Sequence, residues 1–562
     1  MNVQKFNAKG DGDNNDRLAI QMAIDATIAA GGGVVFFPAG DYVVDKNPLP
    51  VPEPQENPQR KSYASFFIDR VTVPLVFEGE GSASIIRMVP GPHDPDPDRN
   101  WAMFRVFASK NVSFHHLLLH GNRRNITPPA EMMQIHCLLL DQALGVTVQN
   151  VEFQEAVDDG IRIMGAASSE SRRLTIVENL FVNPGGNGIT LDGSTTPTVV
   201  AFNHFEGIAQ TPIHCKPSGG PVEDVVMQGN IIKHTSTSLA VSLDHTHRVQ
   251  FVANMILGGE VGCGHLQDFV ISNNVIVGGS GQGHSGLRLY GEAFHGFVTG
   301  NIIRAEPTST GIEVELHGGQ AEKIRLSHNT IVAGKTGINV VEGKDISVSD
   351  NVIESYGAGV VGINVVRNVN NPVDSIQIRN NHIRNFQYGI QAAGNRGNLL
   401  TRLVVVGNQT QGSTEAAIHI SPGVPEATVY GNQADPGETV PLKLESGYIV
   451  TGAGFAGNGS PEGVVAAEVG SLYTRLDTDP VLPRLWVKET GADKTGWAQT
   501  AASFAGNGSP EGVVAARVGS LYTRLDDALE LSRLWVKETG TDARGWAPVV
   551  TAPPLHPNPV SP

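Results

Sequence analysis

Between Asp158 and Glu315 the sequence repeats one short alternating pattern: IRIM (161–164), ITLD (189–192), IHCK (213–216), VSLD (241–244), LRLY (287–290) and IEVE (312–315). Alternate side chains of a β-strand point to opposite faces of the sheet. If the six pieces stack in register, one face therefore consists of Ile, Leu, Val and Cys215, which predicts a core on that side.

The opposite face of the stacked pieces carries mostly polar and charged side chains in two columns. Such columns form either a solvated surface or a binding groove, and the sequence leaves both alternatives open. The first column holds Arg162, Thr190, His214, Ser242, Arg288 and Glu313, and the second holds Met164, Asp192, Lys216, Asp244, Tyr290 and Glu315.

The composition favours a turn-rich all-β protein over a helical one. The chain has 562 residues, of which 65 are glycine, 6% are aromatic and 17% are charged. This length suffices for one large domain and one or more small ones. A net charge of −16 argues against a nucleic-acid partner, because phosphate contacts need a basic surface. A local groove of Arg and Lys still permits an anionic polysaccharide.

Cysteine spacing and hydropathy exclude several further classes of protein. Cys137, Cys215 and Cys263 have the spacing of neither a disulfide framework nor a zinc site. The sequence contains no run of about 20 apolar residues, so no membrane span is predicted. Met1 leads almost directly into sequence that looks folded, so no signal peptide is expected. The chain is then cytosolic, exported by another route, part of a particle, or trimmed; an extracellular or virion-associated location fits the substrate expected below.

The first 45 residues divide into a loop, a helix, a glycine stop and two strands. Asn14 or Asn15 can cap a helix at about 15–30, with Asp16 in its first turn, and Gly31 to Gly33 end it. The helix has one apolar face, formed by Ile20, Ala23, Ile24, Thr27 and Ile28. Strands follow at Val34 to Phe37 and Asp41 to Val44.

This arrangement resembles the N-terminal signature of the pectate-lyase-like superfamily of right-handed parallel β-helices. The resemblance implies a single-stranded solenoid whose open end is capped by the helix. It also implies a carbohydrate partner, because the superfamily includes pectin-active enzymes, glucanases and phage tailspikes that cut bacterial surface polysaccharides.

Asparagine recurs at the start of an apolar strand with gaps of roughly 20–30 residues, the range of solenoid repeats. Side-chain amides at one turn of each coil can bond along the stack and satisfy turn backbone groups. We therefore interpret these asparagines as structural. They are Asn150, Asn179, Asn203, Asn230, Asn254, Asn274, Asn301, Asn329, Asn351, Asn381, Asn408 and Asn432.

Proline and repeats mark the remaining parts of the chain. The Pro-rich stretches 47–61 and 90–99 cannot lie in central strands and are predicted to be long loops. FAGNGSPEGVVAA occurs twice, from Phe455 and from Phe504, and predicts two tandem modules after the β-helix (1–450), at 451–500 and 501–550. The copies resemble short β-rich C-terminal modules of phage tail and other surface proteins. We expect their Trp and Tyr residues to form small cores, and residues 551–562 to be disordered.

The columns suggest the acid and base of a glycosidase. Asp192 and Asp244 flank Lys216, and if they lie two coils apart their separation is roughly 9.6 Å before side-chain reach is counted. An inverting glycosidase needs its carboxyls about 6.5–9.5 Å apart. Lys216 would keep one carboxylate ionised, and His214, His245 and His247 add groups that titrate near neutral pH. Asp192 and Asp244 are therefore the predicted catalytic pair, with no metal or cofactor.

A polysaccharide lyase would use the same residues differently. Lys216 or Arg248 would abstract a proton, and Arg162 and Arg288 would pair with a uronate. Ca²⁺ would then be a cofactor, held by the oxygens of Asp192 and Asp244. The remaining column members Tyr290, Glu313 and Glu315 would contact substrate in either reaction.

A second resemblance concerns Asp158-Asp159-Gly160, which looks like the Asp-Asp element of polygalacturonases. GQGHSGLRL (281–289) resembles their Gly-His-Gly and Arg elements, although the spacing differs. The resemblance makes Asp158, Asp159, His284 and Arg288 candidates. A non-catalytic glycan-binding tail or adhesin is the alternative from another class, and a homotrimer is compatible with both enzymatic interpretations.

Overall fold

The computed structural model describes residues 1–548, and the following are outside the description: 48–60, 93–98, 128–133, 166–168, 194, 219, 235–238, 279–284, 316–320, 367–372, 395–399, 422, 425, 436–439, 441, 446–447, 452–453, 466, 468–470, 477–484, 492–493, 500–503, 507–508, 515–519, 525–533 and 540–541. Most of both Pro-rich loops, the C-terminal tail and His284 lie outside the described residues. The chain divides into two compact units: Met1–His419 with Asn432–Lys443, and Ile420–Gly431 with Leu444–Pro562.

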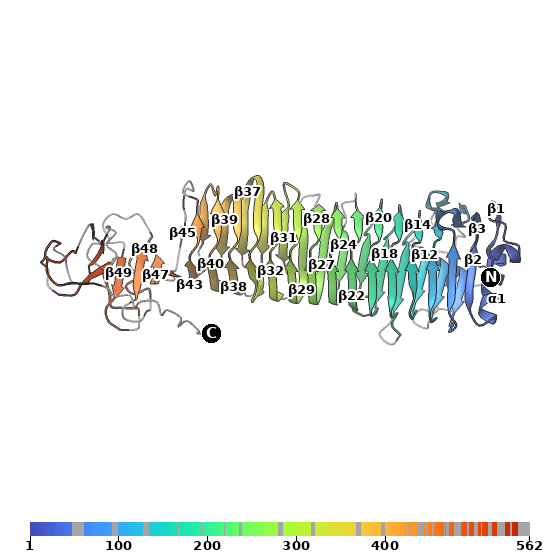
Figure 1. Cartoon of the computed structure of the whole chain (residues 1–562), viewed down its shortest axis with the longest axis horizontal. Helices are drawn as coiled ribbons and strands as arrows, with labels where there is room; N and C mark the ends of the chain where they lie inside the picture. Colours follow the sequence, from blue (N-terminus) through green and yellow to red (C-terminus); the bar gives the residue numbers. More distant parts are fainter. Residues whose placement is uncertain are drawn as a thin grey trace, which may run out of the picture. The chain divides into compact units, whose positions relative to one another are not determined.

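The first unit is a right-handed parallel β-helix, as predicted. Its strands form three parallel stacks. Figure 1 shows the successive coils of this unit in colours that run from blue to orange along the chain. Stack A consists of β4 (Lys61–Asp69), β8 (Arg99–Phe107), β12 (Ile135–Asp141), β15 (Ile161–Gly165), β18 (Ile189–Gly193), β21 (Ile213–Lys216), β24 (Leu239–Asp244), the first parts of β27 (Glu260–Ser272) and β29 (Ser285–Thr299), β31 (Thr310–Glu315), β34 (Thr336–Val340), and the last parts of β37 (Val352–Val366) and β39 (His382–Ala393).

Stacks B and C complete each coil, and the chain visits the stacks in the order B, C, A. Stack B consists of β2 (Gly33–Phe37), β5 (Leu75–Gly79), β9 (Val112–His115), β13 (Thr147–Gln149), β16 (Leu174–Val177), β19 (Thr198–Ala201), β22 (Val222–Gln228), β25 (Thr246–Val252), the last parts of β27 and β29, β32 (Ala321–Ser327), β36 (Ser347–Ser349), β38 (Val373–Arg379) and β40 (Leu400–Val406). Stack C consists of β3 (Gly40–Val44), β6 (Ser84–Met88), β10 (Leu118–His120), β14 (Glu152–Gln154), β17 (Leu180–Val182), β20 (His204–Glu206), β23 (Ile231–Lys233), β26 (Met255–Leu257), β28 (Val275–Gly278), β30 (Ile302–Ala305), β33 (Thr330–Ala333), the first parts of β37 and β39, and β41 (Gln409–Gln411).

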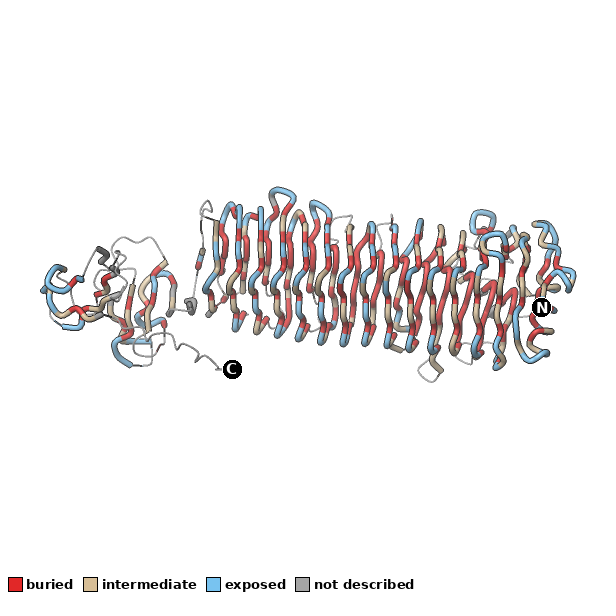
Figure 2. The backbone as a smooth tube through the Cα atoms, viewed as in Figure 1, coloured by how far each residue is buried: buried red, intermediate tan, exposed pale blue. Residues whose placement is uncertain are grey.

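The six quoted pieces lie in stack A with the predicted inward and outward faces. Their first and third residues, such as Ile161, Leu191 and Cys215, are fully buried in the interior of the coils. Figure 2 shows this alternation of buried and more exposed residues along the tube. One coil was missed: β27 places Val261 and Cys263 inward between VSLD and LRLY. Its outward positions are Gly262 and Gly264, so the alternation there carries no polar signal.

The asparagines form a continuous ladder at the turn between stacks B and C. The Oδ1 of Asn254 accepts from the backbone N–H and the side-chain Nδ2 of Asn230, and its own Nδ2 donates to Asn274 and to the Met227 carbonyl. The same pattern runs from Asn179 to Asn432. Asn150 is the exception, and its assignment to the ladder was wrong. It is exposed with φ +53°, and Val151 takes the ladder position, where its N–H donates to Asn179.

Helix α1 (Arg17–Ala29) packs against η1 (Val3–Phe6), β2 and β3 through buried Ile20, Ala23, Ile24 and Thr27. It begins one or two residues later than expected, because the N-cap residue is Asp16 instead of Asn14 or Asn15. The Asp16 side chain makes no hydrogen bond to the first turn of the helix; its carboxylate accepts from Lys9 N and Gly10 N. No helix among the described residues is both long and apolar enough to cross a membrane.

The second unit contains the two repeats, and their strand patterns are the same. In the first copy β47 (Gly454–Gly457), β48 (Leu472–Arg475), β49 (Leu485–Lys488) and β50 (Trp497–Gln499) pair in order, and in the second β51 (Phe504–Gly506), β52 (Leu521–Arg524), β53 (Leu534–Lys537) and β54 (Trp546–Pro548) do so. Their aromatic residues are core, as expected: Tyr473, Trp486 and Trp497 cluster in the first copy, and Tyr522 and Trp546 in the second.

Candidate functional site

The outward face of stack A gathers charged side chains between β12 and β29, in the register that the sequence predicted. Met164 pairs with Asp192 and Asp192 with Lys216, while the neighbouring Cys215 pairs with Leu243 of the next coil. Lys216 and Asp244 therefore follow Asp192 on consecutive coils. Two groups of side chains result, one around Asp158 and one around Asp244.

The first group is centred on two adjacent carboxyls in the turn before β15. Asp159 is buried, with 1% of its side chain exposed, whereas 24% of the Asp158 side chain is exposed. Both carboxyls face the coil that follows, where a Cβ added to Gly186 would lie 2.1 Å from Asp158 Oδ1 and 2.8 Å from Asp159 Oδ1. A glycine at position 186 therefore leaves the space that the two carboxyls occupy.

Burial and, as the second largest cause, repulsion from Asp159 raise the pKa of Asp158 to about 7. Burial also raises the pKa of Asp159, although the Arg162 guanidinium and the Asn187 N–H, which donates to Asp159 Oδ1 at 2.9 Å, oppose that rise. Two carboxyls this close titrate as a pair. Of the two carboxyls, Asp158 is the member that solvent can reach.

His136 reaches the carboxyl pair from β12, one coil earlier. It is 2% exposed, and its Nδ1 lies 3.8 Å from Asp158 and 3.7 Å from Asp159. Burial and the Arg162 charge lower the His136 pKa well below 6.5, so the ring is neutral. Its Nδ1 accepts the Asp159 backbone N–H at 3.4 Å. The sequence reasoning missed this histidine, because it lies 22 residues before Asp158 in another coil.

Arg162 and Asp192 form a buried ion pair beside these carboxyls, with 8% and 4% of their side chains exposed. Arg162 NH1 also lies 3.7 Å from Asp159 Oδ2. The guanidinium thus compensates carboxylates from two successive coils. Asp192 was predicted to act on substrate, but its burial leaves little of it for a sugar to touch.

His214 lies between the two groups and is half-buried. Burial lowers its pKa, and the charges of Lys216, Asp192, Arg162 and Asp244 all act on the ring. The imidazole is therefore neutral around pH 7 and is positioned among the predicted residues. Lys216 is exposed on the same face.

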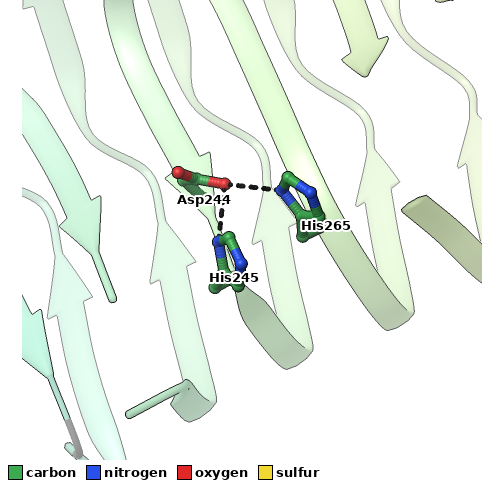
Figure 3. A group of neighbouring side chains, drawn as sticks. All are labelled: Asp244, His245 and His265. Carbon is green, nitrogen blue, oxygen red and sulfur yellow. Dashed lines mark hydrogen bonds and ion pairs between the residues drawn. The ribbon is translucent and has the colours of Figure 1, made fainter. Parts of the chain in front are cut away.

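The second group joins Asp244 to two histidines. Asp244 Oδ1 lies 3.0 Å from His245 Nδ1 and 3.1 Å from His265 Nδ1, as Figure 3 shows. His265 belongs to the β27 coil, where apolar residues alternate with glycine and the sequence pattern gives no polar signal.

Other predicted residues lie farther along or on another stack. Arg288 pairs with buried Glu260 at 2.8 Å and lies over the Tyr290 ring. Glu313 accepts from Ser285 and from Asn339, and Glu315 lies two residues further along β31 on the same face. Arg248 and His247 lie in stack B, where both contact Glu223 and Arg248 also bonds Asp224. The structure therefore does not bring Arg248 and His247 to the outward face of stack A.

Comparison with known proteins places the fold in a recognised group. Residues 1–214 match the family model described as rhamnogalacturonase A/epimerase, pectate lyase-like, and residues 261–434 match that of the right-handed β-helix region. These matches confirm the resemblance to pectate-lyase-like parallel β-helix proteins.

Similar individual proteins come from Azotobacter vinelandii. The mannuronan C5-epimerase AlgE4 is 60% identical over 43 residues, which are 8% of this chain and 8% of that protein. Alginate lyase 7 is 58% identical over 43 residues, 8% of this chain and 5% of that protein. The chain thus matches less than a tenth of the length of these curated relatives. The AlgE6 epimerase A-module has a solved structure with 18% identity and a TM-score of 0.38, over 78% of this chain and 99% of that one.

Proposed function

We propose that the protein is an enzyme that cleaves glycosidic bonds of a polysaccharide on the outward face of stack A, with Asp158 as the proton donor. The observation that carries the proposal is the partly exposed Asp158 carboxyl whose pKa is about 7. A general acid works best when its pKa lies near the working pH. Environments that push the pKa values of neighbouring groups apart are typical of acid and base assignments.

In the proposed hydrolysis, Asp158 transfers its proton to the glycosidic oxygen as the bond to the anomeric carbon breaks. Water attacks that carbon and gives a proton to the neutral His214 ring. Burial lowers the His214 pKa, so the ring is neutral near pH 7 and is able to accept a proton as the base. His136 and Arg162 position the carboxyl pair, because both are buried and lie next to Asp159.

This assignment differs from the pair Asp192 and Asp244 that the sequence suggested. The Arg162–Asp192 ion pair is almost fully buried, so we assign Asp192 to holding Arg162 in place. Lys216 is exposed beside His214 and is suited to contact an acidic group on the sugar. A polysaccharide substrate fits an extracellular or virion-associated location, and a homotrimer is compatible with it.

A second candidate is proton abstraction at C5 of a uronate, which leads to β-elimination or to epimerisation. The neutral His214 ring next to exposed Lys216 favours it, since the ring can take the proton while Lys216 pairs with the uronate carboxylate. The short matches to a mannuronan epimerase and an alginate lyase support the same chemistry.

The experiment is digestion of a panel of neutral and uronate-containing polysaccharides with three readouts. New reducing ends without unsaturated-uronate absorbance support hydrolysis, and both signals together support elimination. A changed ratio of uronate epimers by NMR, without cleavage, supports epimerisation. Binding without any product would favour the glycan-binding adhesin.

The site itself is tested on the active substrate with Asp158→Asn and His214→Gln. Each is expected to lower kcat by about 10²–10⁴-fold, the usual contribution of general acid–base catalysis. Asp268→Asn, which changes an exposed carboxylate on stack B in the same way, is the matched control and should keep full activity. Undiminished rates in Asp158→Asn would overturn the assignment.

A further inference from the structure

The Asp244 group brings together three atoms that are able to bind a metal ion, one carboxylate oxygen and two imidazole nitrogens, from two coils. Asp244 ends β24, and His245 follows it in the chain. Asp244 pairs with Gly264 in the parallel ladder, so His265 occupies on the next coil the position that His245 holds on its own. The two imidazole rings stack with centroids 4.1 Å apart and an angle of 23° between their planes. Both Nδ1 atoms face the same Asp244 oxygen (Figure 3).

We propose that Asp244, His245 and His265 bind a divalent transition-metal ion, with Zn²⁺ as the reference ion. Carboxylate oxygen and imidazole nitrogen bind Zn²⁺ at about 2.0–2.2 Å, so donor atoms around one ion lie about 3.0–3.5 Å from each other. The Asp244 oxygen lies 3.0 Å and 3.1 Å from the two nitrogens, and all three donor atoms are within 4.8 Å of one another. The two oxygen–nitrogen distances therefore match the spacing of donor atoms around one ion.

The donor types select the class of ion. Two imidazoles and one carboxylate suit Zn²⁺, Fe²⁺, Ni²⁺ or Cu²⁺, whereas Ca²⁺ and Mg²⁺ prefer oxygen ligands throughout. This ion therefore differs from the Ca²⁺ that a lyase interpretation of Asp192 and Asp244 would need. Three protein ligands leave at least one coordination position open for water or another oxygen ligand.

Two glycines on the neighbouring coils make room for this arrangement. A Cβ on Gly264 would lie 2.7 Å from Asp244 Oδ1 and 2.4 Å from the Tyr290 ring. A Cβ on Gly291 would lie 2.8–3.1 Å from three atoms of the His265 imidazole, and Gly291 has φ +70°. Larger residues at these positions would displace the carboxylate or the ring.

The site lies on the same face as His214, whose pKa already responds to the Asp244 charge. A bound ion with an open position would present a Lewis acid to a hydroxyl or carboxylate oxygen of a glycan lying along stack A. The binding of metal is independent of the reaction proposed above, because the donor set includes neither Asp158 nor His214.

The test is titration of the full chain, purified without a histidine tag and freed of metal, with ZnCl₂ alone. Calorimetry and competition with a chromophoric chelator measure affinity and stoichiometry, and Co²⁺ substitution reports nitrogen and oxygen coordination by its visible spectrum. We expect one equivalent to bind, with at least about tenfold weaker affinity in His245→Ala, His265→Ala and Asp244→Asn, judged by the tenfold or greater effects of disturbing metal sites.

His295→Ala is the matched control, because His295 Nδ1 lies 3.2 Å from Asp268 in a similar exposed pair, which forms no group of three donors within the described part of the chain. It should bind Zn²⁺ like the unchanged chain. His245→Gln and His265→Gln repeat the test with side chains of similar polarity, and circular dichroism of the metal-free variants checks their fold. Absence of a bound equivalent, equal affinity in all variants, or preference for Ca²⁺ over Zn²⁺ would each overturn the proposal.

Discussion

Replacing Asp158 by asparagine should raise stability at alkaline pH while it lowers activity, because one raised pKa underlies both effects. The Asp158 pKa is about 7 in the fold and 3.8 for an ordinary aspartate. Between these values the folded chain binds more protons than the unfolded chain, so stability falls as pH rises through this window. Each pKa unit corresponds to about 1.4 kcal/mol, which gives a loss of about 4 kcal/mol above pH 7 as an upper limit.

The Asp158→Asn chain carries no charge at this position and avoids that loss. Its free energy of unfolding should exceed that of the unchanged chain by up to about 4 kcal/mol at pH 8 and should match it near pH 4. The measurement is guanidinium denaturation followed by far-UV circular dichroism at a series of pH values, together with kcat on the active substrate. Because Asp158 and Asp159 titrate together, the difference in free energy of unfolding between the two chains should change over more than one pH unit.

Asp192→Asn is the comparison, because it changes the same chemical group with the opposite expected sign. It leaves Arg162 buried beside Asp159 without its main partner, and breaking a buried ion pair usually costs about 3–5 kcal/mol. Two results would exclude the raised Asp158 pKa as the cause: Asp158→Asn is no more stabilised at pH 8 than at pH 5, or both variants change stability in the same direction at pH 8.

Three further predictions concern the ladder, the base and the modules. Asn254→Ala leaves several buried ladder groups without partners and should destabilise the β-helix by roughly 3–6 kcal/mol, whereas exposed Asn150→Ala should cost about 1 kcal/mol in the same denaturation experiment. If His214 is the base, the acidic limb of the kcat profile should lie below pH 6.5, because its pKa is lowered and only the neutral ring accepts a proton; His214→Gln should abolish that limb. Trp497→Ala removes a core ring whose N–H donates to Val465 O, and should cost about 3–5 kcal/mol in tryptophan-monitored unfolding while leaving the far-UV signal of the β-helix unchanged at moderate denaturant.

The Asn ladder and the inward faces of stack A could be predicted because they follow local rules that repeat in every coil. An apolar residue at alternate positions and an asparagine at one turn are visible without knowing what lies next to them. The same logic failed where the local signal was weak. The coil at 261–264 alternates apolar residues with glycine, and Asn150 stands one position before the ladder.

The amino-acid sequence by itself determined the solenoid, its core and the outward set Asp192, His214, Lys216 and Asp244. Only the tertiary structure decided which other side chains lie next to the candidate residues, because the coiling of the chain brings residues that are distant in sequence into contact. His136 reaches Asp158 from the preceding coil, and His265 reaches Asp244 from the following one. Burial then distinguishes the carboxyls: Asp192 is buried in an ion pair with Arg162, and burial raises the pKa of Asp158 to about 7. Both effects depend on surrounding atoms from several coils, which no single stretch of sequence specifies.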